Sequence, residues 1–190
     1  MKKKRIIYKK NIKNNKLNNK LSKNFTKNFN NIISCLDTKK DNFHSFSKNF
    51  KLNFKTSDLQ KFKKYKTIVL IGMGGSILGA EAIYFFLKDK VKKNFIFFND
   101  IDKKKLQKFK SENKLNKVLF IVISKSGNTI ETFSNLLSLN VLKKNSKNII
   151  IISENTNNAL YLLAKKLNLF FIEHKKYIGG RYSVLSEVGL

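Results

Sequence analysis

A short segment of this sequence, residues 124–132, carries an unusual density of hydrogen-bonding side chains. It reads Ser-Lys-Ser-Gly-Asn-Thr-Ile-Glu-Thr, with four hydroxyls, one ammonium and one glycine. Hydroxyls and the free amides at the start of a helix bind phosphate oxygens without leaving a buried unpaired charge. Simple helix capping, with Ser126 or Asn128 as the cap and Glu131 in the first turn, is the alternative. Capping does not require so many donors, so we favour a phosphate-binding loop.

A second loop, residues 72–79, reads Gly-Met-Gly-Gly-Ser-Ile-Leu-Gly. Glycine lets the backbone turn tightly and lets a ligand approach the main chain. The first amides and the dipole of a following helix, together with the Ser76 hydroxyl, would form an anion site. The spacing matches neither the G-x-G-x-x-G dinucleotide fingerprint nor a P-loop, which ends in Gly-Lys-Ser/Thr. Taken alone, this loop is a weak signal.

The elements that position both loops follow from apolar runs without polar alternation, which are typical of parallel strands covered on both faces. The runs are Thr67–Ile71, Phe95–Phe98, Val118–Ile123, Ile149–Ile152 and Leu169–Ile172. The stretches between them predict helices over Ser76–Lys88, Lys103–Lys110, Thr129–Lys143 and Asn157–Leu167. This alternation predicts an α/β fold, a five-stranded parallel doubly wound sheet.

Ligands of such sheets bind beyond the carboxyl ends of the strands, where the winding direction reverses. With the flavodoxin-like strand order, the first and third strands are neighbours at that point. The glycine-rich loop follows the first of these strands and the hydroxyl-rich loop follows the third. We therefore expect both loops to face one crevice.

Residues 1–66 form a prefix rich in Lys and Asn, which we expect to be helical, and residues 67–190 form the sheet domain. In the prefix, Phe25, Phe29, Ile32, Ile33 and Leu36 fall at helical spacing and predict one apolar face. Phe43, Phe46, Phe50 and Phe54 predict a second helical face of the same kind. The single cysteine, Cys35, lies in the first of these stretches and is expected to be a buried structural thiol.

The chain of 190 residues has 40 basic and 12 acidic side chains, a formal charge of +28. Basic charge favours nucleic-acid binding in general, because it neutralises phosphates. Here only Arg5 and Arg181 carry the guanidinium that suits bidentate contacts. Proline is absent, whereas Asn, Ile and Phe abound, so A/T-rich codons explain the lysine content. We interpret the charge as a solvated surface, and we expect no nucleic-acid partner.

The sequence has no apolar run of the roughly 18 residues that a membrane helix needs. Its basic start, MKKKRIIYKK, is not followed by an apolar stretch of signal-peptide length. We therefore expect a cytoplasmic protein without a membrane partner.

Three segments together resemble the successive signatures of the glucose-6-phosphate isomerase family. They are the two loops, extended to Ile71–Gly79 and Ser124–Thr132, and the segment Gly-Gly-Arg-Tyr-Ser at residues 179–183. The segment Asn99–Asp102 also resembles the family's short Asn/Asp segment after the second strand. The match covers about residues 65–190 and implies the first sugar isomerase (SIS) domain of the family, cut off before the second.

The resemblance implies a role for each matching residue. Gly75 and Ser76 would contact the sugar phosphate, and Arg181 would stabilise the enediolate. The phosphate would be held by Ser124, Lys125, Ser126 and Thr129, with Gly127 and Asn128 supplying backbone in the same loop. The alternative for Arg181 is a surface or capping arginine. The resemblance also implies a homodimer, a sugar-phosphate substrate, and neither cofactor nor metal.

The family's reaction interconverts glucose 6-phosphate and fructose 6-phosphate, a step of glycolysis and gluconeogenesis. It needs a base to move a proton between C1 and C2 and an acid to open the ring. In the family these are a glutamate, a histidine and a lysine that lie well beyond the Gly-Gly-Arg segment. We expect His44 and His174 to be surface or packing residues, and Glu187 not to be the base. Residues 184–190 predict the start of a helix, so the chain resembles an amino-terminal portion that binds but does not turn over substrate.

Two other interpretations share some of these features. A phosphosugar-sensing SIS regulator, or the isomerase domain of an amidotransferase, has the phosphate loop but no need for the Gly-Gly-Arg segment. A Lys-rich nucleic-acid-binding protein would explain the charge but not the loops. Substitution of Arg181 separates the first of these from an isomerase, and the salt dependence of binding tests the second.

Overall fold

The computed structural model describes residues 15–38 and 42–189. Its centre is a five-stranded sheet in which all neighbours are parallel, in the order β2-β1-β3-β4-β5. The strands are β1 (Thr67–Gly72), β2 (Asn94–Phe98), β3 (Val118–Ile123), β4 (Ile149–Ser153) and β5 (Phe170–Glu173). The predicted strands and the flavodoxin-like order are confirmed.

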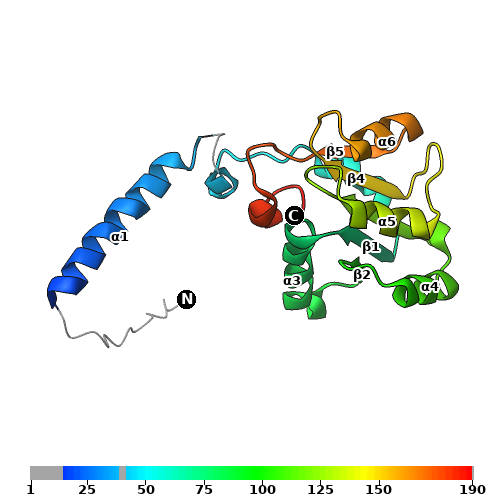
Figure 1. The fold of residues 1–190 in the computed structure, drawn as a ribbon, viewed down its shortest axis with the longest axis horizontal. Helices are drawn as coiled ribbons and strands as arrows, with labels where there is room; N and C mark the ends of the chain where they lie inside the picture. The colour runs from blue at the N-terminus through cyan, green and yellow to red at the C-terminus, as the bar shows by residue number, and fades with distance from the viewer. Residues whose placement is uncertain (1–14, 39–41, 190) are drawn as a thin grey trace.

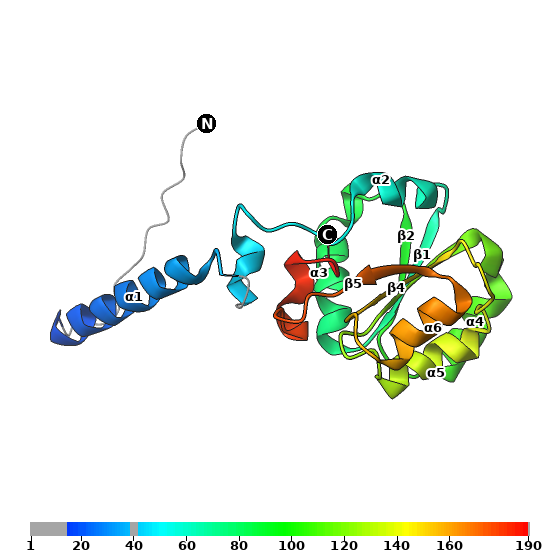
Figure 2. The same ribbon diagram turned by 90° about the horizontal axis from the view of Figure 1, so that it is seen from above.

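Four helices connect the strands: α3 (Leu78–Phe86), α4 (Lys103–Glu112), α5 (Ile130–Leu139) and α6 (Ala159–Leu167). Crossovers between parallel strands are right-handed, so connections that run in opposite directions across the sheet lie on opposite faces. The step from β1 to β2 runs one way and the later steps run the other. Accordingly α4, α5 and α6 share one face of the sheet, whereas α3 packs on the other (Figure 2).

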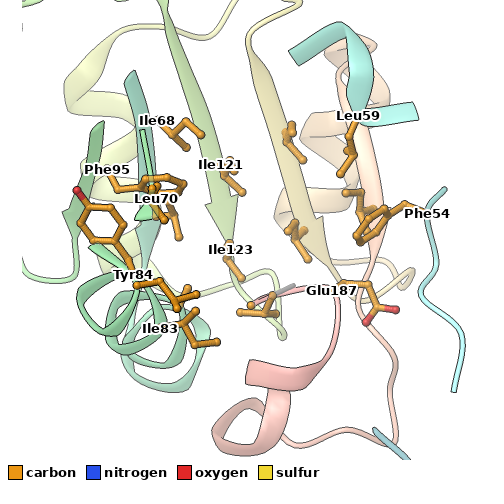
Figure 3. Close-up of a pocket in the computed structure, with 18 residues that line it drawn as sticks. Phe54, Leu59, Ile68, Leu70, Ile83, Tyr84, Phe95, Ile121, Ile123 and Glu187 are labelled. Carbon is orange, nitrogen blue, oxygen red and sulfur yellow. The ribbon is translucent and has the colours of Figure 1, made fainter. Parts of the chain in front are cut away.

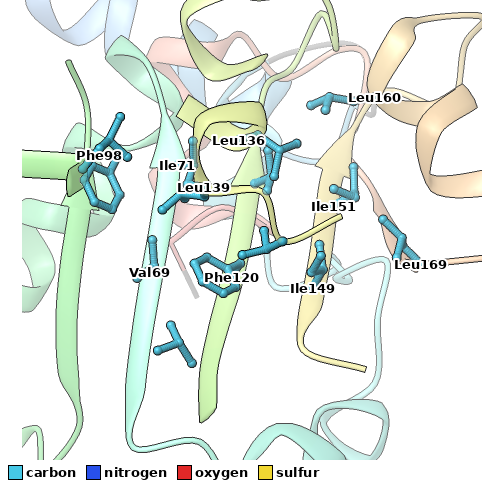
Figure 4. Close-up of a cluster of buried hydrophobic side chains, with 14 of the residues drawn as sticks. Val69, Ile71, Phe98, Phe120, Leu136, Leu139, Ile149, Ile151, Leu160 and Leu169 are labelled. Carbon is cyan, nitrogen blue, oxygen red and sulfur yellow. The ribbon is translucent and has the colours of Figure 1, made fainter. Parts of the chain in front are cut away.

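Each strand supplies both hydrophobic cores because successive side chains point to opposite faces. Val69, Ile71, Phe120 and Ile151 pack with Leu136 and other side chains of α4, α5 and α6 (Figure 4). The alternate residues of the same strands face α3. Burial on both faces explains why the strands appear in the sequence as continuous apolar runs rather than as alternating patterns.

The α3 face is less completely covered. There the helix, the sheet and the chain around Phe54 and Leu59 enclose an apolar cavity of about 290 Å³ (Figure 3). Leu59 belongs to the short helix α2 (Thr56–Leu59), which continues as the 3₁₀ helix η2 (Gln60–Phe62). Phe62 and Tyr65 are buried against this face, so the end of the prefix contributes to the core.

Before the sheet, α1 (Asn15–Cys35) projects away from the α/β body (Figure 1). The helix expected from the first apolar stripe is present, and its apolar side chains are exposed; Phe25 is 68% exposed and Phe29 49%. Cys35, expected to be buried, is the last residue of α1 and is only half-buried. The part of the prefix before residue 15 lies outside the described residues.

The prediction of a helix with a second apolar face, formed by Phe43, Phe46, Phe50 and Phe54, is wrong. A 3₁₀ helix, η1 (Asn42–Phe46), holds only its first part, and the chain from residue 47 to 55 is not helical. Side chains of Asn42 and Asn53 in this stretch bond to residues more than 100 positions later. These long-range contacts hold the chain in an irregular path that local spacing does not encode.

Two predicted helix boundaries also differ. The helix expected over Thr129–Lys143 ends at Leu139, because Asn140 adopts a left-handed conformation (φ 53°) that terminates the helix. The helix expected from Val184 is instead the 3₁₀ helix η6 (Gly180–Leu185), followed by turns. Within it the Ser183 hydroxyl donates to the Gly180 carbonyl at 2.7 Å, a local bond that competes with α-helical pairing. Further 3₁₀ helices are η3 (Gly74–Ser76), η4 (Lys88–Lys90) and η5 (Leu115–Lys117).

Candidate functional site

The two loops singled out by the sequence follow neighbouring strands whose ends are level. Ile71 pairs with Val122, and Gly72 pairs with Ile123. A Cβ on Gly72 would lie 2.9 Å from the Ile123 carbonyl oxygen, so glycine permits the close approach of the strands here. Both loops therefore leave the carboxyl edge of the sheet side by side, as expected at a topological switch point.

The glycine loop turns through one short 3₁₀ helix before α3 begins at Leu78. Gly74 has φ +53°, a left-handed conformation that glycine adopts without strain. The Ser76 amide is already bonded to the Met73 carbonyl at 3.1 Å, and Ile77 is the N-cap of α3. Ser76 thus lies before the helix rather than in its first turn, but it stays on the same edge of the sheet.

The hydroxyl-rich loop is organised around Ser124, which is buried with 2% exposure. Its Oγ lies 2.8 Å from Thr129 Oγ1 and 3.4 Å from Ser126 Oγ, and it accepts a hydrogen bond from the Gly127 amide at 3.2 Å. Ser126 itself is exposed. Three of the four hydroxyls therefore meet at one point, with a buried member fixing the other two.

The fourth hydroxyl of the segment does not join them. Thr132 lies in α5, is fully buried, and its Oγ1 has no hydrogen-bond partner among the described residues. A helix places residues three or four apart on one face, so a side chain one turn into α5 points toward the core.

Capping of α5 does not account for the polar side chains of this loop. Thr129 is the N-cap of α5 and makes no side-chain capping bond. Asn128 instead accepts a hydrogen bond from the Ala159 amide at 3.0 Å, at the start of α6. The Leu160 amide likewise donates to the Gly127 carbonyl at 3.0 Å. The loop is thus fastened to the amino terminus of the next helix, which fixes its path.

Gly127 could not be replaced without disturbing this packing. It has φ +66°, and a Cβ at this position would overlap the Asn158 side chain, with Oδ1 only 1.8 Å away. Asn158 caps α6 through the Tyr161 amide at 2.9 Å. Sequence reasoning missed Asn158, whose one signal is its position at the start of a predicted helix.

Lys125 brings the only ammonium group of this loop. Its Nζ donates to the Lys176 carbonyl at 2.9 Å and lies 3.5 Å from the Glu154 carboxylate, which follows β4. The Glu154 amide donates in turn to the Lys125 carbonyl at 3.0 Å. Both side chains are partly buried, so the ammonium is held at the carboxyl edge of the sheet rather than swinging freely.

The Gly-Gly-Arg segment packs directly on the glycine loop. A Cβ on Gly75 would lie 2.4 Å from the Gly180 carbonyl oxygen and 2.7 Å from the Arg181 amide, so the two backbones touch. The Ser183 hydroxyl lies 3.3 Å from the Gly75 carbonyl. Arg181 is exposed. The structure therefore brings together all three segments that sequence reasoning selected, although they are separated by about 50 residues in each step.

The Asn/Asp segment after β2 is used structurally. The Asn99 side-chain amide donates to Glu81 of α3 at 2.9 Å, and the Asp102 carboxylate accepts from the Lys105 amide at 3.0 Å. Asp102 is therefore the N-cap of α4.

Behind the Gly-Gly-Arg segment lies a group of buried polar side chains that carry no motif. His44 (2% exposed) has its Nδ1 2.7 Å from the Tyr177 hydroxyl, and His174 (1% exposed) contacts the Lys175 carbonyl at 3.0 Å. Burial lowers the pKa of His174, whereas burial, aided by the Glu187 carboxylate, raises the pKa of Tyr177. Of the two alternatives expected for these histidines, surface or packing, their burial agrees with packing.

Glu187 joins the same group through one carboxylate oxygen, whereas its buried Oε2 has no hydrogen-bond partner among the described residues. Its Oε1 accepts from the Asn53 amide at 2.9 Å and pairs with the Lys175 ammonium, and its side chain is 0% exposed. A carboxylate held in this way is poorly placed to take a proton from a ligand at the carboxyl edge.

Residues 15–38 and 42–189 contain no cluster of three or more His, Cys, Asp or Glu side chains able to hold a metal ion. Within the same ranges, no helix has the length and apolar character required to cross a membrane.

Comparison with known proteins identifies glucose-6-phosphate isomerases among the relatives of this chain. The glucose-6-phosphate isomerase of Borreliella burgdorferi strain ZS7 is 37% identical over an alignment 142 residues long, which covers 67% of this chain and 26% of the relative. That of Methanocaldococcus jannaschii is 35% identical over an alignment 138 residues long, which covers 70% of this chain and 34% of the relative. The chain thus spans between a quarter and about a third of the length of these relatives.

Solved structures agree with the fold. A hypothetical protein from Thermus thermophilus superposes with a TM-score of 0.61 at 27% identity, over 66% of this chain and 31% of that one. A glucose-6-phosphate isomerase from Chlamydia trachomatis shares the fold with a TM-score of 0.60 at 24% identity, over 76% of this chain and 32% of that one. The family model described as phosphoglucose isomerase matches residues 6–190, nearly the whole sequence, and the chain belongs to this family.

Proposed function

We propose that this chain is the sugar-phosphate-binding portion of a glucose-6-phosphate isomerase, which interconverts glucose 6-phosphate and fructose 6-phosphate through an enediolate. The observation that carries the proposal is the meeting of three distant segments at one edge of the sheet. Ser124 and its neighbouring hydroxyls, the glycine loop and the Gly-Gly-Arg segment converge there. Neutral donors and one ammonium suit a phosphate dianion that binds and leaves in every turnover.

The proposed roles follow from the chemistry of each group. Gly75 and Ser76 contact the sugar phosphate through the glycine loop. Arg181 stabilises the negative charge that develops on the enediolate oxygens, because a fixed cationic donor acts most strongly on charge formed in the transition state. The phosphate is held by Ser124, Lys125, Ser126 and Thr129, with backbone from Gly127 and Asn128.

The proton-transfer groups of the reaction are proposed to lie outside this chain. Glu187 is paired with Lys175, Glu81 is bonded to Asn99, and both histidines are buried away from solvent. The chain alone is therefore proposed to bind sugar phosphates without turning them over. We further propose that residues 67–190 form the first SIS domain of the enzyme and residues 1–66 its helical prefix.

The setting of the complete enzyme is part of the same proposal. The isomerase acts in glycolysis and gluconeogenesis in the cytoplasm, as a homodimer, without nucleic-acid or membrane partners. Oligomeric state and location concern the longer protein and are tested on it.

The proposal is tested by titrating the ¹⁵N-labelled chain with fructose 6-phosphate, fructose and inorganic phosphate. The amides of Ser126 and Gly127 should shift with fructose 6-phosphate and, more weakly, with inorganic phosphate, but not with fructose. Ser124→Ala should weaken fructose 6-phosphate binding about tenfold, since it removes a hydroxyl and loosens the Gly127 amide.

Lys144→Ala provides the control, because Lys144 is exposed in the connection that enters β4 at the opposite edge of the sheet. This variant should bind as the unmodified chain does. Equal shifts with fructose and fructose 6-phosphate, or shifts confined to the far edge, would refute the assignment of the phosphate site. Steady isomerisation by the chain alone would refute the proposed absence of proton-transfer groups.

A further inference from the structure

The Gly-Gly-Arg segment has little in its own sequence that fixes its conformation. Gly179 has φ −64° and Gly180 has open space where a Cβ would be, so neither backbone conformation requires glycine; a Cβ on Gly179 would meet only residues outside the glycine pair, 3.2 Å from both Asn42 Oδ1 and the Tyr182 ring. Two successive glycines have a large conformational entropy when unconstrained. An exposed Arg181 that follows them can be aimed only if contacts from elsewhere hold its backbone.

One side of the segment is held by the glycine loop, through the contact of Gly75 with Gly180 and Arg181. The opposite side is held by the prefix. The Asn42 side-chain oxygen Oδ1 accepts a hydrogen bond from the Gly179 amide, and His44 Nδ1 lies 2.7 Å from the Tyr177 hydroxyl. The segment is therefore gripped between residues far from it in the sequence on both sides.

The prefix is also held by hydrogen bonds of Asn53, eleven residues after Asn42 in the sequence. The Asn53 amide bonds to Glu187 at 2.9 Å, its side-chain amide donates to the Glu173 carbonyl at 3.0 Å, and Lys175 donates to its Oδ1 at 3.0 Å. We call residues 42–54 the strap. The strap bonds to Glu173 and Lys175, which precede the Gly-Gly-Arg segment in the sequence, and to Glu187, which follows it.

The pair formed by the buried His44, near the start of the strap, and the partly buried Tyr177 is well suited to this task. His44 is 2% exposed and its ring packs edge-on against Phe50, with centroids 5.4 Å apart, and beside Tyr177 at 5.6 Å. A short hydrogen bond in an apolar setting has a single strongly preferred geometry, because breaking it leaves buried polar atoms unpaired.

From these contacts we infer that Asn42, His44 and Tyr177 are positioning residues that fix the backbone of the Gly-Gly-Arg segment and thereby aim Arg181 at the ligand. The part of the inference that concerns the ligand rests on the role proposed for Arg181. The part that concerns the fixed backbone of the Gly-Gly-Arg segment does not depend on that role. Preorganised placement of a charged donor is worth more than its mere presence, since no ordering is then needed when charge develops.

The chain offers a direct readout because it contains only two arginines, Arg5 and Arg181. In a ¹⁵N-labelled sample the side-chain Nε–H region therefore holds two signals, and Arg181→Lys identifies one of them. Tyr177→Phe removes a single hydroxyl, and Asn42→Ala removes the acceptor of the Gly179 amide. Either change should shift or broaden the Arg181 signal and speed hydrogen exchange at residues 179–183 without ligand.

Tyr161→Phe is the matched control, because Tyr161 lies on α6 and packs against Phe171. It should leave the Arg181 signal unchanged. Hydrogen exchange at the amides of β3 reports on the fold, so a variant that merely unfolds is recognised. The Asn42 and Tyr177 variants test the same inference independently. An Arg181 signal identical to that of the unmodified chain in both would overturn it.

Fructose 6-phosphate affinity then tests the coupling. Tyr177→Phe should weaken binding about two- to tenfold, the effect of one hydrogen bond. The double variant with Arg181→Lys should bind no more weakly than Arg181→Lys alone, whereas additive losses would overturn the inference. A changed Arg181 signal with no sugar-phosphate binding at all would contradict the proposed function and leave the strap's role standing.

Discussion

At the scale of single residues, polar side chains of the site are already held by hydrogen bonds or ion pairs to other residues of the chain. Ser124 is bonded to two other members of its loop, and Lys125 is paired with Glu154. Such groups lose little conformational entropy on binding, which favours affinity without adding contacts. The hydroxyl loop could be predicted from sequence because its composition is local. The partner Glu154 could not, since it reaches the loop from another strand.

His174 gives the first pH prediction. Burial lowers its pKa in the folded chain, so the unfolded chain, with a histidine pKa of about 6.5, takes up the proton first as the pH falls. This group therefore leaves the free energy of unfolding unchanged above that pH and decreases it below. Urea unfolding measured between pH 7.5 and pH 5 should show this decrease.

His174→Gln should flatten the decrease, whatever its effect on stability at pH 7.5. The slope of stability against pH, rather than stability itself, is the relevant measurement. An unchanged slope in the variant would show that His174 is not the group that titrates.

At the scale of elements, tight contacts between loops and neighbouring helices set the geometry of the site. Gly127 illustrates this because it combines a left-handed conformation with contact to Asn158, whereas Gly74 has the conformation without any neighbour within 4 Å. Comparing the two therefore separates backbone strain from steric overlap.

Gly74→Ala should cost about 1 kcal/mol of unfolding free energy, the strain of a left-handed residue. Gly127→Ala should cost more, at least about 2 kcal/mol, since the added methyl also displaces the residue that caps α6. Chemical denaturation measures both, and Gly180→Ala, with open space and no positive φ, should be neutral. Equal losses at Gly74 and Gly127 would contradict the packing of Gly127 against Asn158.

At the scale of the whole molecule, the excess of positive charge is the property with the largest expected effect on stability. The charge of +28 is not concentrated at the phosphate loop, which contributes a single lysine. Like charges spread over a surface repel one another and destabilise the compact state. The excess of lysine is thus expected to lower the free energy of unfolding, by an amount that depends on the salt concentration.

Raising sodium chloride from about 20 to about 300 mM shortens the Debye length and screens this repulsion. We expect stability to rise by about 1 kcal/mol, or about 2–4 °C in melting temperature for a chain of this size. Thermal unfolding by circular dichroism tests this, and Lys125→Ala, which removes the phosphate-loop ammonium, should show the same rise. A rise lost in that variant would indicate anion binding at the loop instead.

The sequence by itself determined the strands and the three signature segments, because buried parallel strands and glycine- or hydroxyl-rich turns are encoded by nearby residues. Tertiary structure decided the rest. It placed Thr132 in the core, directed Asn128 toward α6, and gave the stretch from Asn42 to Phe54 one short 3₁₀ helix and an irregular path beside the Gly-Gly-Arg segment. The physical reason is that these placements depend on partners distant in the sequence, 31 positions away for Asn128 and more than 100 for the strap, and only the folded chain brings such partners together.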